Sequence, residues 1–207
     1  MDRYNNHFSI AKGVSLVAFG FLFLFLDFNL IFSESFSIDI LPDAVGWLLF
    51  LLSVRYLEDY IKNPTGMRVF AFFLFLEEIL QWSFSLSGED ASAFELKADD
   101  LRFLFFLMSL CTLFFFYQIH GIMIRVAEDF RAPQGNTIRI LRPFMLFIQL
   151  AVCILFLFPE AGKELFLCVV IPGVTAAIVN LFALFGLREE VINADQNDVV
   201  LSSEDSY

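Results

Sequence analysis

The residues of this sequence that could do chemistry are a few acidic and polar side chains inside long apolar runs. Adjacent Glu77 and Glu78 lie about halfway along one run, and Asp27 lies near the end of another. A carboxylate at the centre of a bilayer costs at least about 2.5 kcal/mol on insertion scales, so it needs a partner, a proton or water. These carboxylates are therefore the first candidates for a binding site.

Spacing favours Glu78 over Glu77 as the inward-facing carboxylate. Adjacent residues on a helix point in different directions, so at most one of the two faces squarely inward. Glu78 is seven residues from Ala71 and from Ser85, whereas Glu77 is seven residues from a phenylalanine on either side. Small residues mark the faces on which membrane helices pack. We therefore expect Glu78 to face the interior.

Three further polar residues can join Glu78 in a buried cluster. Counting the helix rise of 1.5 Å per residue puts Gln149 at a similar depth, with His120 and Asn180 somewhat nearer the cytoplasm. Small residues at helical spacing also place Gly13, Gly20 and Asn180 on inward faces. The plainer interpretation of His120 is a packed histidine, and we favour it over a proton carrier.

A second candidate site lies at the outer end of the first two runs. Asp27 is close in depth to Asp43, which follows Pro42 in IDILPDAVGW. Proline suits the first turn of a helix, and an acidic residue there complements the helix dipole. For Asp43 this structural interpretation is favoured over ligand binding. For Asp27 a ligand-binding role and a structural hydrogen bond have equal weight.

The elements that must position these residues are membrane-spanning helices. Of the 207 residues, 58% are hydrophobic and 18% are charged, whereas about a quarter are charged in soluble domains. A helix of about 20 residues crosses a hydrocarbon core roughly 30 Å thick. The sequence predicts an all-α integral membrane bundle of about six transmembrane helices. One domain of residues 1–188 would hold spans near 10–32, 42–60, 67–86, 101–126, 138–158 and 164–187.

The distribution of positive charge predicts the orientation. Ten of the 13 Lys and Arg residues fall at the N-terminus or in alternate connections, namely Arg3, Lys12, Arg55, Lys62, Arg68, Arg125, Arg131, Arg139, Arg142 and Arg188. Cytoplasmic loops carry such an excess, so both termini are expected in the cytoplasm of a multi-pass cell-membrane protein. Residues 189–207 are acidic without a basic residue, which predicts a disordered cytoplasmic tail.

Several functional classes are disfavoured. The three cysteines form no Cys-x-x-Cys pair, and with two histidines in the chain neither a metal site nor another cofactor is expected. Motifs of hydrolases, metalloproteases and P-loop enzymes are missing from the sequence, so we expect no enzyme. The net charge of −11 argues against nucleic-acid binding.

The stretch FLFLDFNLIF…IDILPDAVGWLLFLLSVRYL resembles a group of small, uncharacterised membrane proteins of Gram-positive bacteria. In that group a helix ending in Asp leads to a Leu-Pro-Asp-x-x-Gly motif that opens the next helix. The resemblance covers roughly the first 60 residues and implies that Asp27, Pro42, Asp43 and Gly46 lie together. It implies no activity.

Two functions remain open. The leading one is binding or transport of a small solute, such as a cation or a proton-coupled solute, captured near Asp27 and Asp43 and held near Glu78. A solute-binding subunit of a larger transporter belongs to the same class. The alternative is a non-catalytic membrane partner protein (an immunity, sensor or assembly subunit) whose acidic tail docks a cytoplasmic protein.

Overall fold

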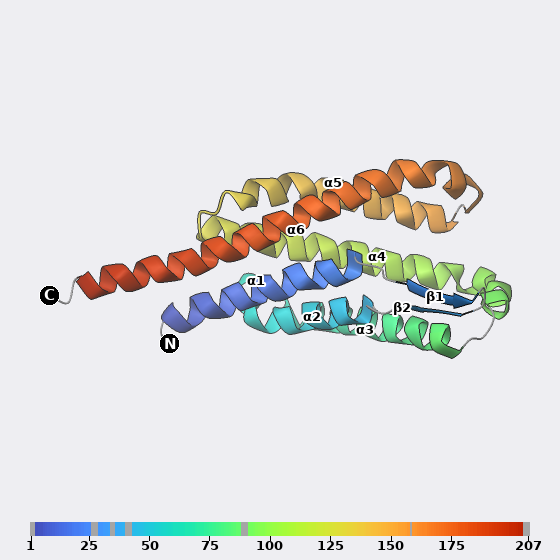
Figure 1. Ribbon diagram of the computed structural model, residues 1–207, viewed down its shortest axis with the longest axis horizontal. Coiled ribbons are helices and arrows are strands. Elements are labelled where there is room, and N and C mark those ends of the chain that lie inside the picture. Colours follow the sequence, from blue (N-terminus) through green and yellow to red (C-terminus); the bar gives the residue numbers. More distant parts are fainter. Residues whose placement is uncertain are drawn as a thin grey trace.

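The computed structural model describes residues 3–25, 29–33, 36–39, 43–87, 91–157 and 159–204, with side chains for 7–25, 43–80, 106–151, 154 and 169–194. The described chain forms six α-helices, one 3-10 helix (η1) and one antiparallel β-hairpin (Figure 1). In chain order the elements are α1 (Arg3–Phe25), β1 (Asn29–Ser33), β2 (Phe36–Asp39), α2 (Asp43–Tyr56), η1 (Glu58–Tyr60), α3 (Pro64–Ser87), α4 (Ala91–Asp129), α5 (Gln134–Leu157) and α6 (Pro159–Glu204). The predicted helical architecture is confirmed, and the hairpin is an addition to it.

Among the residues that the structure describes, three segments are long and apolar enough to cross a membrane, namely His7–Phe25 in α1, Phe106–Asp129 in α4 and Val169–Ala194 in α6. Large apolar side chains also cover the outside of the bundle, among them Phe182 and Ile140, each 74% exposed. Soluble proteins rarely expose apolar surface on this scale. Membrane association therefore follows from both the helices and the surface.

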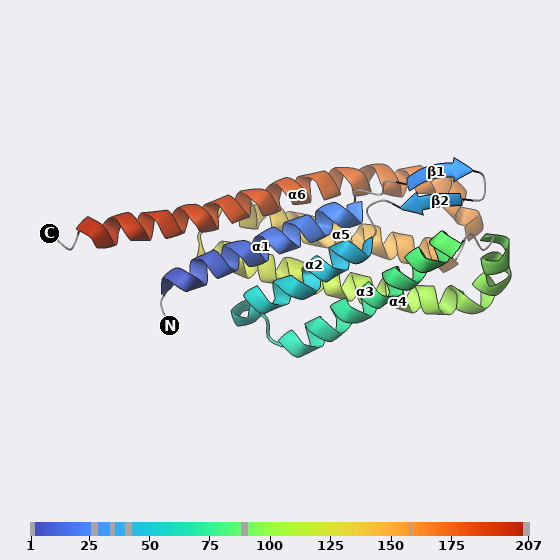
Figure 2. The ribbon, with the colours of Figure 1, turned by 60° about the horizontal axis from the view of Figure 1, so that its bottom comes forward.

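The helices run alternately up and down along one long axis (Figures 1 and 2). The start of α1 and the end of α6 lie at the same end of the bundle, with the α2–α3 and α4–α5 connections, and the hairpin lies at the opposite end. Helix α1 packs on α2 and α6, α5 packs on α4 and α6, and α3 packs chiefly on α2 and only sparsely on α4. This uneven packing of α3 shapes the site described below.

Glycines bring α1 and α2 close together. A Cβ atom on Gly46 would lie 2.8 Å from the backbone oxygen of Gly20, and one on Gly13 would lie 2.7 Å from Leu57 Cγ. In lipid there is no hydrophobic driving force between helices, so membrane helices associate through close packing, which small residues allow. The predicted inward stripe is confirmed at Gly13 and Gly20, which are both buried.

The first span does not reach residue 32 as predicted. Helix α1 ends at Phe25, and residues Asn29–Ser33 form a strand that pairs with Phe36–Asp39 in the register Asn29↔Asp39 and Leu30↔Ile38. The segment is rich in β-branched and aromatic residues, which favour strands. An apolar run alone could not separate the helix from the strand.

Two helices extend ten or more residues beyond their predicted ends. Helix α4 begins at Ala91, ahead of the predicted start at 101, because the acidic stretch before the apolar run is rich in the helix formers Ala, Glu, Leu and Lys. Helix α6 runs on to Glu204 through the segment predicted to be a disordered tail. That segment holds neither Gly nor Pro after Leu187, and Val191 on its first turns is buried in the core.

Candidate functional site

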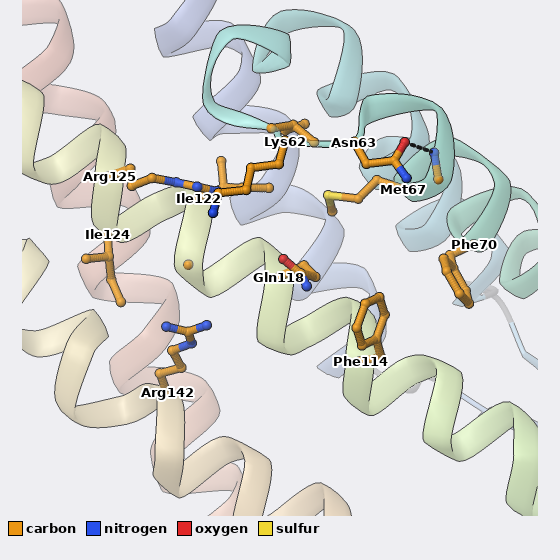
Figure 3. A pocket seen from close by; sticks show the side chains of 13 residues that line it. Lys62, Asn63, Met67, Phe70, Phe114, Gln118, Ile122, Ile124, Arg125 and Arg142 are labelled. Carbon is orange, nitrogen blue, oxygen red and sulfur yellow. Dashed lines mark hydrogen bonds between the residues drawn. The ribbon is translucent and has the colours of Figure 1, made fainter.

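A cavity of about 550 Å³ opens between the α2–α3 connection, α3, α4 and α5 (Figure 3). Its lining includes Lys62 and Asn63 of the α2–α3 connection, and that connection lies at the same end of the bundle as the start of α1. Thirteen residues line it, namely Ile61, Lys62, Asn63, Gly66, Met67, Phe70, Phe114, Gln118, Gly121, Ile122, Ile124, Arg125 and Arg142. Its volume falls within the range of about 300–1,000 Å³ that is typical of ligand pockets.

Arg142 of α5 reaches across the cavity to α4. Its guanidinium carbon lies 3.8 Å from the centre of the Tyr117 ring, a cation–π geometry. A Cβ on Gly121 would lie 3.2 Å from the Arg142 Nη2 atom, so the glycine gives the guanidinium room to lie against α4. Figure 3 shows this side chain rising from α5 toward the wall formed by α4.

Helix α4 supplies a second cation and an amide. Phe114, Gln118, Gly121 and Arg125 recur at helical spacing and form one stripe of α4 that faces the cavity. Arg125 lies at the end of this stripe, toward the helix terminus, and its guanidinium extends toward Lys62 (Figure 3). The stripe therefore changes from aromatic to cationic along its length.

The connection before α3 is fixed by two hydrogen bonds. Asn63 caps α3, because its Oδ1 accepts a 3.0 Å hydrogen bond from the backbone N–H of Gly66, with Pro64 in the first turn. The Tyr60 hydroxyl donates a 2.8 Å hydrogen bond to Asp129 Oδ2 at the end of α4. Burial and the neighbouring Asp129 carboxylate raise the pKa of Tyr60. These contacts hold Lys62 at the cavity.

The cavity is electropositive. Among the described residues, its lining includes Lys62, Arg125 and Arg142 and no acidic residue. Both arginine Nε atoms are buried without a hydrogen-bond partner. Within the described side chains, the Lys and Arg ion pairs are Arg68 with Glu58 and Arg139 with Glu128, and neither involves a cavity residue. Unpaired N–H donors on cationic groups favour an anionic ligand.

Half of the predicted polar cluster is present. His120 and Asn180 are 2% and 0% exposed, and His120 Nε2 lies 3.2 Å from Asn180 Oδ1. His120 Nδ1 donates to the carbonyl oxygen of Phe116 at 2.8 Å, and the ring packs beside Phe21 of α1. In this orientation of the Asn180 amide an oxygen faces each ring nitrogen, so a protonated imidazole would donate two hydrogen bonds. The Nδ2 atom of Asn180 is buried without a partner. If the amide is turned by 180°, Nδ2 donates to His120 Nε2 and the ring can be neutral.

Glu78 is not at the level of this pair. Phe70 of α3 packs against Phe114 of α4, with ring centres 5.4 Å apart. From that contact Glu78 lies about two turns along α3 in one direction, and His120 lies nearly two turns along α4 in the other. Their levels therefore differ by about 20 Å. Glu77 and Glu78 are both partly buried, so burial does not distinguish the predicted inward carboxylate from its neighbour, and Glu77 lies within electrostatic range of Cys111 on α4.

Gln149 is also displaced from the pair. Ile148 of α5 lies 3.4 Å from where a Cβ on Gly173 would be, so Gln149 is level with that part of α6. Asn180 is two helical turns farther along α6, about 10 Å away. The four-residue cluster thus reduces to the hydrogen-bonded pair of His120 and Asn180.

The outer candidate site is described only in part. Asp43 is the first residue of α2 and is partly buried, which agrees with its expected place in the first turn. Asp27 and Pro42 lie outside the described residues. Within the described residues, no group of three His, Cys, Asp or Glu side chains could hold a metal ion.

The cationic cavity residues were missed as site candidates. Lys62, Arg125 and Arg142 entered the sequence argument only as markers of orientation. The available signal was the helical spacing of Gln118, Gly121 and Arg125, which gives α4 a polar stripe separate from that of His120.

Comparisons with protein-family models, curated proteins and solved structures find no match to this chain.

Proposed function

We propose that this chain is a six-span protein of the cell membrane, with cytoplasmic termini, that binds a small anionic molecule in the cavity between α3, α4 and α5. The alternation of six helices supports an even number of crossings. The connections rich in Lys and Arg lie at the same end as the start of α1 and the end of α6. By the positive-inside rule that end, and the cavity with it, faces the cytoplasm.

The observation that carries this proposal is the convergence of Lys62, Arg125 and Arg142 from three elements on one cavity without an acidic residue. A low-dielectric wall strengthens the field of such charges. These charges would repel a cation. We therefore propose an anion as the ligand of this site, in place of the cation or proton-coupled solute expected from the sequence. The side chains of the lining suit binding or passage of a solute better than catalysis, because they include no hydroxyl or thiol nucleophile.

The orientation makes a direct prediction. In a variant without Cys111, Cys153 and Cys168, the change Asp90→Cys should react with a membrane-impermeant maleimide on intact cells. The change Asn136→Cys should react only after permeabilisation, because it lies in the first turn of α5, which begins at the end of the bundle rich in Lys and Arg. Labelling would be read by gel shift. The reverse pattern would place the cavity outside the cell.

Anion binding should depend on Arg142. Inorganic phosphate, added to purified protein at constant ionic strength in an uncharged detergent, should raise the thermal unfolding midpoint. The variant Arg142→Gln should need about tenfold more phosphate for the same rise, since a hydrogen bond to a charged group contributes about 1.5–3 kcal/mol.

The matched control is Arg139→Gln, on the same helix but exposed and paired with Glu128 outside the cavity. It should respond to phosphate as the wild type does. An equal loss in both variants would mean that phosphate acts on surface charge in general, and the cavity would not be the site.

A further inference from the structure

We infer that the anion is the phosphate headgroup of an anionic phospholipid, whose acyl chains leave the cavity sideways between α3 and α4. This inference rests on the proposed function, because it names the source of the anion that the cavity binds. The ligand is then a lipid from the leaflet nearest the cavity and not a free ion.

The cavity has the polarity gradient of a lipid. Arg125 and Phe114 stand at opposite ends of the same α4 stripe, 11 residues apart and so separated by about 16 Å. Lys62 and Arg142 complete the cationic part. Phe70 and Phe114 form the other part, where their rings pack together. A free phosphate ion would gain nothing from this aromatic part, whereas an acyl chain would bury apolar surface against it.

The aromatic part is open to the side. Helix α3 packs chiefly on α2 and touches α4 only sparsely. Phe70 and Phe114 are 37% and 46% exposed although both line the cavity. Phe73 and Leu107 continue the same faces of α3 and α4 by helical spacing and are also exposed. An acyl chain lying along this seam would stay in contact with the bilayer.

Two of the three cations are at the depth of headgroups, and Arg142 lies about two turns into α5. Lys62 lies in the α2–α3 connection, and Arg125 lies one turn before the end of α4. Basic pockets between helices on the cytoplasmic side are recognised binding sites for anionic headgroups. The Nε–H groups of Arg125 and Arg142 are buried without a hydrogen-bond partner. A phosphate would give them a charged acceptor, which water and lipid carbonyl groups cannot.

The test measures which lipid the protein retains. Protein would be reconstituted in nanodiscs of phosphatidylcholine with a minority of phosphatidylglycerol, extracted in an uncharged detergent, and its bound lipids quantified by mass spectrometry. Wild-type protein should retain phosphatidylglycerol above its share of the mixture. Each of Arg125→Gln and Arg142→Gln should lower this enrichment about fivefold, and Arg139→Gln should leave it unchanged.

A second pair of variants separates a lipid from a free ion. Phe70→Ser and Phe114→Ser should reduce retention of phosphatidylglycerol while leaving the phosphate-induced rise in unfolding midpoint intact, which also confirms that the variants fold. Retention at the bulk ratio by the wild type, or equal loss in Arg139→Gln, overturns the lipid inference. If phosphate still acts through Arg142, the proposed anion site stands; if it does not, both fall.

Discussion

Replacing Gly46 with alanine is expected to lower the free energy of unfolding by about 1–3 kcal/mol, the usual cost of overpacking a tight core. The added Cβ would lie 2.8 Å from the backbone oxygen of Gly20 and 2.9 Å from Leu24 Cγ. A side chain can rotate away, but the carbonyl oxygen of Gly20 moves only with α1 itself. The loss should exceed the gain of up to about 1 kcal/mol that alanine brings to a helix interior.

Gly173→Ala is the matched control for this prediction. A Cβ at Gly173 meets its nearest atom, Ile148 Cγ2, at 3.4 Å, an ordinary van der Waals distance. This variant should unfold at or slightly above the wild-type midpoint in a detergent titration followed by circular dichroism. Similar behaviour of the two alanine variants would show that α1 and α2 are not held at the close distance described here.

Replacing Asn180 with leucine is expected to destabilise the protein by about 1–3 kcal/mol, because it leaves a buried ring nitrogen of His120 without a partner. His120→Phe should cost a comparable amount by leaving the amide of Asn180 unpaired. The double variant should recover much of the loss, since both polar groups are then gone.

The four proteins of this cycle can be compared by the same detergent titration. Strictly additive losses would show that His120 and Asn180 do not stabilise each other, and their contact would carry no coupling energy. Phosphate binding should be unchanged throughout, because neither residue lines the cationic cavity.

Helical periodicity in the sequence predicted which face of a helix a residue lies on. It did not predict how far neighbouring helices are shifted along the bundle axis. Gly20 was placed on an inward face from its spacing alone, and so was Asn180. Glu78 was placed near the level of His120, and that depth was wrong. That depth was counted from the predicted helix ends, whereas α3 is staggered against α4: Phe70, six residues after the start of α3, packs on Phe114, 15 residues before the end of α4.

The cationic cavity depends on features that no periodicity contains. Lys62 and Arg142 are 80 positions apart in the chain, and they share a cavity only because α3 packs chiefly on α2 and leaves space beside α4. Long Lys and Arg side chains also reach several ångströms from their backbone, so their ends converge from elements that do not themselves touch. Counting charges therefore placed these residues on the same side of the membrane without placing them together.

The length of α6 has a consequence for the space beyond the membrane. Its 46 residues extend about 69 Å, more than twice the thickness of the hydrocarbon core. In the proposed orientation, the part of α6 after Ala194, where the apolar segment ends, is a spacer of roughly 15 Å. Its acidic residues are repelled by anionic headgroups until they stand more than a Debye length of about 8 Å away. Anything attached to the C-terminus is therefore carried at a fixed distance from the bilayer and pointed away from it.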